Sequence, residues 1–135
     1  MKSFLYLHCS DLERARRFYS NVLGLPEIYF SADEGSVGYQ AGSLQLTIGH
    51  HDHAQLRTDW ARQLGWSEGT SAEPSWGFHL EADQFHEAVE RTRAGGVKAR
   101  FEEPRWVGYR SFPVMDPMGN TVEVSATDRD AWPAS

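Results

Sequence analysis

Two stretches decide the fold of this chain: FLYLHCSDL at residues 4–12 and WGFHLEAD at residues 76–83. Each begins with the alternation of a strand that has one buried face, and each leads into a helical pattern that ends at glycine. Asp11 and Asp83 take the same place in the two stretches. This echo predicts a duplicated supersecondary unit, with a pocket between its two copies.

Composition limits the classes of partner. The 135 residues carry a net charge of −6 at pH 7, which disfavours a nucleic-acid surface and favours neutral or cationic partners. No apolar run is long enough to span a bilayer, and the first residues lack the apolar core of a signal peptide. Cys9 is the single cysteine, so a disulfide framework is excluded. We therefore expect a cytoplasmic protein that contacts neither nucleic acid nor membrane.

The first copy reads as strand, helix and three further strands. In the strand at residues 3–9, alternation places Cys9 toward the helix, where a buried structural thiol is favoured over a nucleophile. Ser10 is expected to cap the helix with Glu13 reaching back, and Gly24 to end it. The three strands that follow are predicted at residues 27–32, 36–41 and 43–49.

The second copy repeats this order. A strand is predicted at residues 75–82, followed by a helix that Asp83 caps and Gly95 ends. Three further strands are predicted at residues 97–101, 109–115 and 120–126.

The predicted fold class is therefore α+β, with two tandem βαβββ modules. We expect the first module at residues 1–49, the second at 75–126, and a tail at 127–135. Between the modules, the linker at residues 50–74 is expected to contain a short helix near residues 54–64.

The sequences DLERARRFYSNVLGL at residues 11–25 and DPMGNTVEV at residues 116–124 resemble the vicinal oxygen chelate superfamily of glyoxalases, bleomycin-resistance proteins and extradiol dioxygenases. The similarity extends over residues 3–126. It implies that the modules form a cupped mixed sheet, with helices on the convex side and the ligand on the concave side. In metal-using members, one side chain from the first and one from the last strand of each module bind a divalent ion.

The resemblance places these four metal positions at Phe4, Gln45, Gly77 and Glu123, with Trp76 in place of Gly77 if the strand register shifts by one. A benzyl group cannot donate electrons to a hard cation, and glycine has no side chain. Two oxygen donors do not make a catalytic zinc, iron or nickel site. We therefore expect no metal and no other cofactor, and keep one divalent ion as the alternative.

Other metal sites are less well supported by the sequence. His8 and His79 share the predicted concave face, and with Gln45 and Glu123 they would make a displaced site. The shift of four residues along a strand, about 13 Å, disfavours that arrangement. For the histidines at residues 50–53, a solvated turn is favoured over a functional metal site.

The predicted concave face combines aromatic rings with polar groups. The residues expected to bind a ligand are Phe4, Tyr6, His8, Tyr39, Gln45, Thr47, Trp66, Trp76, Gly77, His79, Trp106, Tyr109, Glu123 and Ser125. Either Tyr29 or Phe30 is expected to join them. Such a surface suits a planar organic molecule, and the acidic balance of the chain favours a cationic one.

Resemblance to the bleomycin-resistance branch implies metal-independent sequestration of an aromatic antibiotic, in grooves at a homodimer interface. The first alternative is an enzyme: a lyase, isomerase or dioxygenase that uses a metal, or acid/base chemistry at Glu81 and Glu123. The sequence does not assign a catalytic residue; if the protein is an enzyme, Glu123 is the candidate. The second alternative is a module without a small ligand, whose aromatic residues only pack the dimer.

Overall fold

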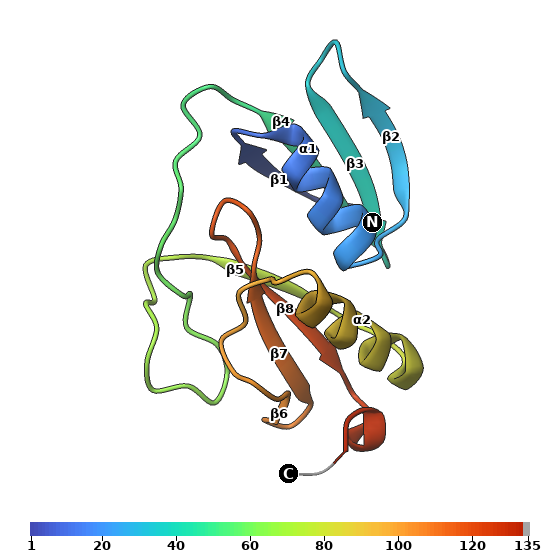
Figure 1. The fold of residues 1–135 in the computed structure, drawn as a ribbon, viewed down its shortest axis with the longest axis vertical. Coiled ribbons are helices and arrows are strands. Elements are labelled where there is room, and N and C mark those ends of the chain that lie inside the picture. The colour runs from blue at the N-terminus through green and yellow to red at the C-terminus, as the bar shows by residue number, and fades with distance from the viewer. Residues whose placement is uncertain (134–135) are drawn as a thin grey trace. The chain divides into compact units, whose positions relative to one another are not determined.

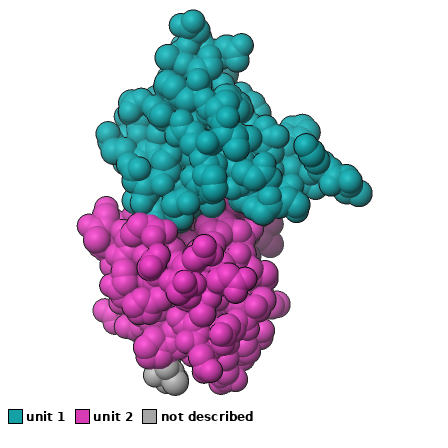
Figure 2. Space-filling model, turned by 90° about the vertical axis from the view of Figure 1, so that its right-hand side faces the viewer, with its two compact units in different colours: residues 1–56 teal, residues 57–135 magenta. Residues whose placement is uncertain are grey.

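The computed structural model describes residues 1–133 and divides into two compact units, residues 1–56 and 57–135 (Figure 2). Each unit contains one βαβββ-like module with a four-stranded mixed sheet, which confirms the predicted α+β class. The boundary between the units falls inside the predicted linker. The last two residues of the predicted tail lie outside the described residues.

The first unit holds four strands and one helical segment (Figure 1). They are β1 (Ser3–Cys9), α1 (Leu12–Arg16), the π-helical turn η1 (Arg17–Val22), β2 (Glu27–Ser31), β3 (Ser36–Ala41) and β4 (Leu44–His50). The sheet order is β1-β4-β3-β2, with β1 and β4 parallel and the other neighbours antiparallel.

Alternation along β1 and β4 separates a covered face from an open face in this sheet. Leu46 and Ile48 are buried on the side of α1 and η1, with Phe18 and Tyr19 from the helical segment. Cys9 is also buried, as the sequence predicts. Phe4 and its alternating neighbours along β1 therefore point to the opposite, open face.

Asp11 caps the first helix, so the prediction of Ser10 as the cap is wrong. The Asp11 backbone is extended, and its Oδ1 accepts a hydrogen bond of 3.1 Å from the Arg14 amide. A carboxylate at this position reaches the third amide of the helix and meets the positive end of its dipole. Gly24 has φ 74°, which confirms it as the residue that ends the helical segment.

The second unit holds the remaining elements. They are β5 (Ser75–His79), α2 (Ala82–Ala94), β6 (Arg105–Trp106), β7 (Arg110–Met115), β8 (Thr121–Ala126) and the 3-10 turn η2 (Arg129–Ala131). The sheet order is β5-β8-β7-β6, with β5 and β8 parallel. The stripe of α2 that includes Phe85 and Val89 is buried, and so are Val122 and Val124 of β8. No helix among residues 1–133 is long and apolar enough to cross a membrane.

The second helix begins two residues earlier than predicted. Its N-cap is the extended Glu81, not Asp83. Asp83 lies within the first turn, where its Oδ1 accepts from the Gln84 amide and its charge favours the helix dipole.

Residues 97–101 do not form the predicted strand. Only the isolated bridge between Ala99 and Val114 and two flanking backbone hydrogen bonds join this segment to β7. Pro113 lies in the middle of the contact and has no N–H to donate, so a regular ladder cannot form there.

The predicted helix at residues 54–64 is also absent, and this described segment is irregular. Its backbone donors are used in tertiary contacts: the Arg57 amide donates to the Met118 carbonyl and the Ala61 amide to Thr121 Oγ1. These bonds replace the local ones that a helix would need.

Candidate functional site

The site is built on the parallel pair of strands β5 and β8 in the second unit. Gly77 pairs with Glu123, and His79 pairs with Ser125. Because side chains alternate along a strand, these four residues share the face opposite to Val122 and the rest of the core. The register assigns Gly77, and not Trp76, to the position beside Glu123.

Glu123 is held by two hydroxyl groups. Tyr109 Oη donates to the carboxylate, at 2.9 Å from Oε1 and 3.0 Å from Oε2, and Ser111 Oγ donates to Oε2 at 2.5 Å. Burial, the hydrogen bond to Glu123 and the charge of that carboxylate together raise the pKa of Tyr109 to about 12. The phenol therefore stays protonated and keeps donating across the whole physiological range.

His79 is held from the other side by Ser125. Ser125 Oγ lies 2.8 Å from the Phe78 carbonyl oxygen and 2.7 Å from His79 Nδ1. The His79 ring also meets the Tyr109 ring edge-on, with 5.4 Å between the centroids. One ring edge of His79 is thus fixed by the protein, while the side chain as a whole is exposed.

Gly77 brings the two parallel strands close together. A Cβ at this position would lie 2.5 Å from the Glu123 carbonyl oxygen and 2.9 Å from the Glu123 Cβ. Real side chains do not approach their neighbours so closely, so position 77 has to be glycine. It contributes backbone and open space to the site, but no side chain that could coordinate a metal.

These residues line a cavity of about 230 Å³. Its walls are Gly77, Phe78, His79, Tyr109, Glu123 and Ser125. Among these described lining residues there is no lysine or arginine to neutralise the Glu123 carboxylate. The cavity therefore offers hydrogen-bond acceptors and negative charge, which suits a cationic group.

The residues at the four metal positions do not fit a metal ion. In the first unit, Phe4 pairs with Gln45, and in the second, Gly77 pairs with Glu123. The set supplies one carboxylate and one neutral amide, and that carboxylate already accepts from two hydroxyls. Within residues 1–133, no three His, Cys, Asp or Glu side chains are grouped so that they could hold a metal ion. His8 and the histidines at residues 50–53 therefore form no such group either.

The open face of the first sheet is aromatic. Phe4 is 75% exposed and Tyr6 51% exposed. Tyr6, Thr47, Gly38 and Tyr29 form one row across the four strands of this sheet. The Tyr29 ring lies over Gly38, in the space where a side chain would otherwise stand. This register selects Tyr29 for the open face, and Phe30 lies beneath the Arg16 guanidinium.

Tyr39 does not lie on this open face, although the sequence predicts it there. It is fully buried against Tyr19, and its hydroxyl lies 2.8 Å from Ser20 Oγ. Alternation along β3 puts Gly38 on the open side and Tyr39 on the helical side, so Tyr39 is a core residue of the first unit. His8 stays on the open face, edge-on to Tyr6 and to His51.

The three predicted tryptophans are not among the residues that line the Glu123 cavity. Trp66 meets Phe101 edge-on, with the Arg100 guanidinium over its ring. Trp106 has Arg110 and Arg129 over its ring. Trp76 is tilted against Phe78 on β5. In the second unit, each of these half-buried rings therefore contacts neighbouring aromatic or basic side chains, and contact with a ligand stays a prediction.

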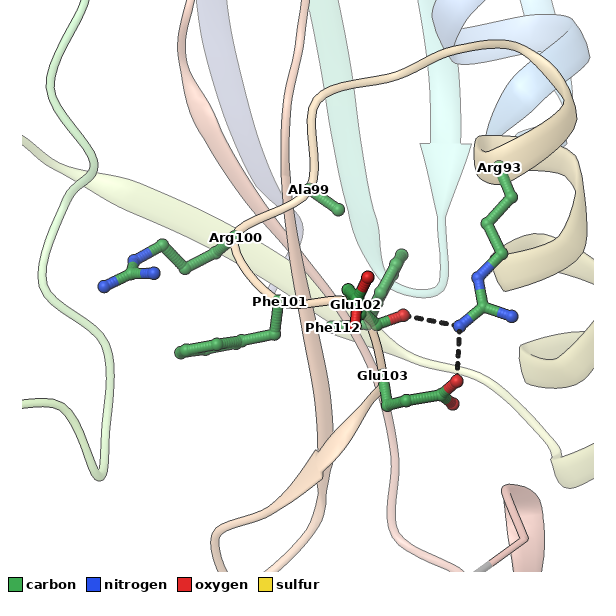
Figure 3. Close-up of a pocket in the computed structure, with 7 residues that line it drawn as sticks. All are labelled: Arg93, Ala99, Arg100, Phe101, Glu102, Glu103 and Phe112. Carbon is green, nitrogen blue, oxygen red and sulfur yellow. Dashed lines mark hydrogen bonds and ion pairs between the residues drawn. The ribbon is translucent and has the colours of Figure 1, made fainter. Parts of the chain in front are cut away.

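A larger cavity, of about 530 Å³, lies on the helical side of the same sheet (Figure 3). Both of its arginines already have acidic partners. Arg93 donates to the Glu102 carbonyl and lies 3.3 Å from the Glu103 carboxylate, while Arg100 pairs with Glu68 outside the cavity. Figure 3 shows Arg100 and Phe101 directed away from Arg93. Since both arginines and Glu103 already have partners of opposite charge, the smaller cavity at Glu123 is the better candidate for ligand recognition.

Ser111 is the one residue of the Glu123 network that the sequence analysis missed. It lies on β7 directly opposite Ser125, and alternation from Pro113 would have placed it on the same face. No local motif marks it, because a serine within a strand carries no signal until the pairing of β7 with β8 is known.

Comparisons with known proteins agree with this architecture. The family model described as Glyoxalase/Bleomycin resistance protein/Dioxygenase superfamily matches residues 4–124. No curated protein matches the sequence.

Three solved structures illustrate the likeness in fold. A glyoxalase/dioxygenase from Nostoc punctiforme has 15% identity and a TM-score of 0.73, covering 96% of this chain and 92% of its own. A fosfomycin resistance protein, FosX, from Listeria monocytogenes, solved with Mn(II) and sulfate, has 23% identity, a TM-score of 0.66 and coverages of 97% and 92%. A lactoylglutathione lyase from Agrobacterium tumefaciens has 23% identity, a TM-score of 0.59 and coverages of 93% and 92%.

Proposed function

Because this chain belongs to the glyoxalase/bleomycin resistance protein/dioxygenase superfamily but has only two oxygen donors at its four metal positions, we propose that it binds a planar organic cation without a metal ion. The cationic group of the ligand is held in the cavity at Glu123. The biological role that follows is sequestration of an aromatic, cationic antibiotic, without chemical change to it.

One observation carries this proposal: the Glu123 carboxylate is fixed by Tyr109 and Ser111 and faces a cavity whose described lining has no lysine or arginine. The two hydroxyls hold the carboxylate in place, so little side-chain entropy is lost when a ligand binds. Opposite charges about 4 Å apart attract by about 1 kcal/mol in water and about 4 kcal/mol where water is partly excluded.

The first unit, taken by itself, has an open face that also offers aromatic surface. Phe4 and Tyr6 expose ring surface there, beside the polar side chains of Gln45 and Thr47. Exposed aromatic rings of this kind stack on flat molecules and attract cations through their π faces. Contact of these residues with the ligand remains a prediction, and so does a homodimer, which sedimentation of the full chain would test.

The test is a calorimetric titration of protein treated with EDTA, using three probes of similar size. They are 2-naphthamidinium and N-methylquinolinium, which are planar cations, and 2-naphthamide, which is neutral. We expect at least one cation to bind in the presence of chelator, more tightly than the amide, and to lose most of its affinity in Glu123→Gln.

Two results would contradict the proposal. One is the absence of binding by both cations, and the other is equal binding of the cations and the amide. Recovery of the bound cation unchanged after prolonged incubation separates sequestration from the enzymatic alternative, which would convert a ligand to product.

A further inference from the structure

The hydrogen bonds of Ser125 determine which nitrogen of His79 carries the proton. A hydroxyl has one hydrogen, and the Phe78 carbonyl oxygen, 2.8 Å away, can only accept it. The contact of 2.7 Å between Ser125 Oγ and His79 Nδ1 must then run the other way, with Nδ1–H as the donor. In the neutral ring, Nε2 is therefore the unprotonated nitrogen and acts as a hydrogen-bond acceptor.

This tautomer gives the cavity two acceptors on neighbouring strands. Glu123 on β8 contributes a carboxylate, and His79 on β5 contributes a ring whose Nδ1 edge is engaged by the protein. The titratable groups that face His79 from adjoining elements are Glu123 and Tyr109, and Ser125 is the neutral partner. Both hydroxyls that reach Glu123 are already used as donors to it, so a ligand has to bring its own N–H groups.

We propose that the cavity selects a cation with at least two N–H donors, such as an amidinium or a guanidinium, by offering it Glu123 and His79 Nε2 together. A quaternary ammonium or an N-alkylated ring cation has the charge but no N–H, and it gains only the electrostatic part. This inference rests on the proposed function and names the class of ligand for the same site.

The two planar cations test this selection directly. We expect 2-naphthamidinium to bind at least about tenfold more tightly than N-methylquinolinium, since hydrogen bonds to charged groups contribute the equivalent of a tenfold change or more. In His79→Phe, which keeps an aromatic ring without the acceptor, the ratio of the two affinities should fall several-fold but stay above one, because the Glu123 carboxylate still accepts from the amidinium. The control Ser75→Ala, on the same strand but outside the cavity lining, should keep the ratio.

Equal affinities of the two cations at neutral pH would overturn the inference while leaving the proposed function intact, whereas no binding of either cation overturns both.

A second measurement needs no variant of the site. Long-range ¹H–¹⁵N NMR spectra of the unmodified protein at neutral pH distinguish the two tautomers of each histidine. We expect His79 to show a protonated Nδ1 and an unprotonated Nε2. A protonated Nε2 with a bare Nδ1 would overturn the assignment of the acceptor.

Discussion

Gly77 and Glu123 lie side by side on parallel strands, so close that a Cβ at position 77 would lie 2.5 Å from the Glu123 carbonyl oxygen. In a metal-using relative, each of these two strand positions would supply a metal ligand. Here Glu123 supplies a carboxylate, whereas Gly77 has no side chain and leaves a gap. The gap is part of the cavity that exposes Glu123. The position without a side chain and the cavity beside Glu123 are thus parts of the same structural feature.

The first prediction concerns the stability of glycine variants. Gly77→Ala should lower the free energy of unfolding by about 1–3 kcal/mol, because its methyl group meets backbone that cannot move without shifting β8. Gly49→Ala should cost less than about 1 kcal/mol, because its methyl group meets the end of the half-exposed Tyr6 side chain, which can swing away. Urea denaturation of both variants measures the difference. Equal losses of stability would show that the close approach of β5 and β8 is not rigid.

The second prediction concerns the titration of Tyr109. Its pKa is raised from the ordinary 10.0 to about 12, so the folded state holds this proton more tightly than the unfolded state does. The resulting stabilisation is complete below pH 10 and is lost as the pH rises from 10 through 12. Burial also raises the pKa of Tyr39, so absorbance at the tyrosinate band should show more than one late-titrating tyrosine, with one fewer in Tyr109→Phe.

The control for that titration is Glu123→Gln. Removing the carboxylate charge should lower the pKa of Tyr109 toward its ordinary value, although burial, the largest cause of the shift, remains. If Tyr109 titrates with the exposed tyrosines in the parent protein, the hydrogen bond to Glu123 is not formed in solution.

The third prediction tests the cap of the first helix. Asp11→Ala should lower the free energy of unfolding by about 0.5–2 kcal/mol, since it removes the acceptor of the Arg14 amide. Asp11→Asn keeps a side-chain oxygen at the cap and should lie within a few tenths of a kcal/mol of the parent. Thermal unfolding of the two variants measures both effects, and an equally large loss in Asp11→Asn would point to the charge and not to the cap.

The periodic pattern of apolar residues and the short sequence motifs were sufficient to predict most of the fold. Alternation along residues 3–9 assigned Phe4 and Tyr6 to the open face and Cys9 to the core, and the structure agrees. The family resemblance placed either Gly77 or Trp76 at the position that corresponds to Glu123, and the pairing of β5 with β8 selects Gly77. The face on which a side chain lies depends on its position along one strand, because side chains alternate with a period of two. Over a strand this short, errors in the predicted face do not accumulate.

The predictions that failed depend on contacts between distant residues. Residues 54–64 have a helical pattern but donate their amides to Met118 and Thr121, about sixty residues away in the chain. Tyr39 is on the helical side because the pairing of β3 is set by its neighbours β2 and β4, and the pattern of β3 alone does not specify it. Ser111 became visible as a donor to Glu123 only through the pairing of β7 with β8.

The measurement that tests the central claim most directly is the metal content of the protein after incubation with manganese, iron, nickel and zinc and removal of free ions. His51→Ala/His53→Ala should be analysed beside the parent, because loop histidines can bind metal without any functional role. The account predicts less than about a tenth of an equivalent of each metal in this variant. One equivalent of a single metal, retained in the histidine variant and lost in Glu123→Ala, would contradict the account and identify Glu123 as a metal ligand.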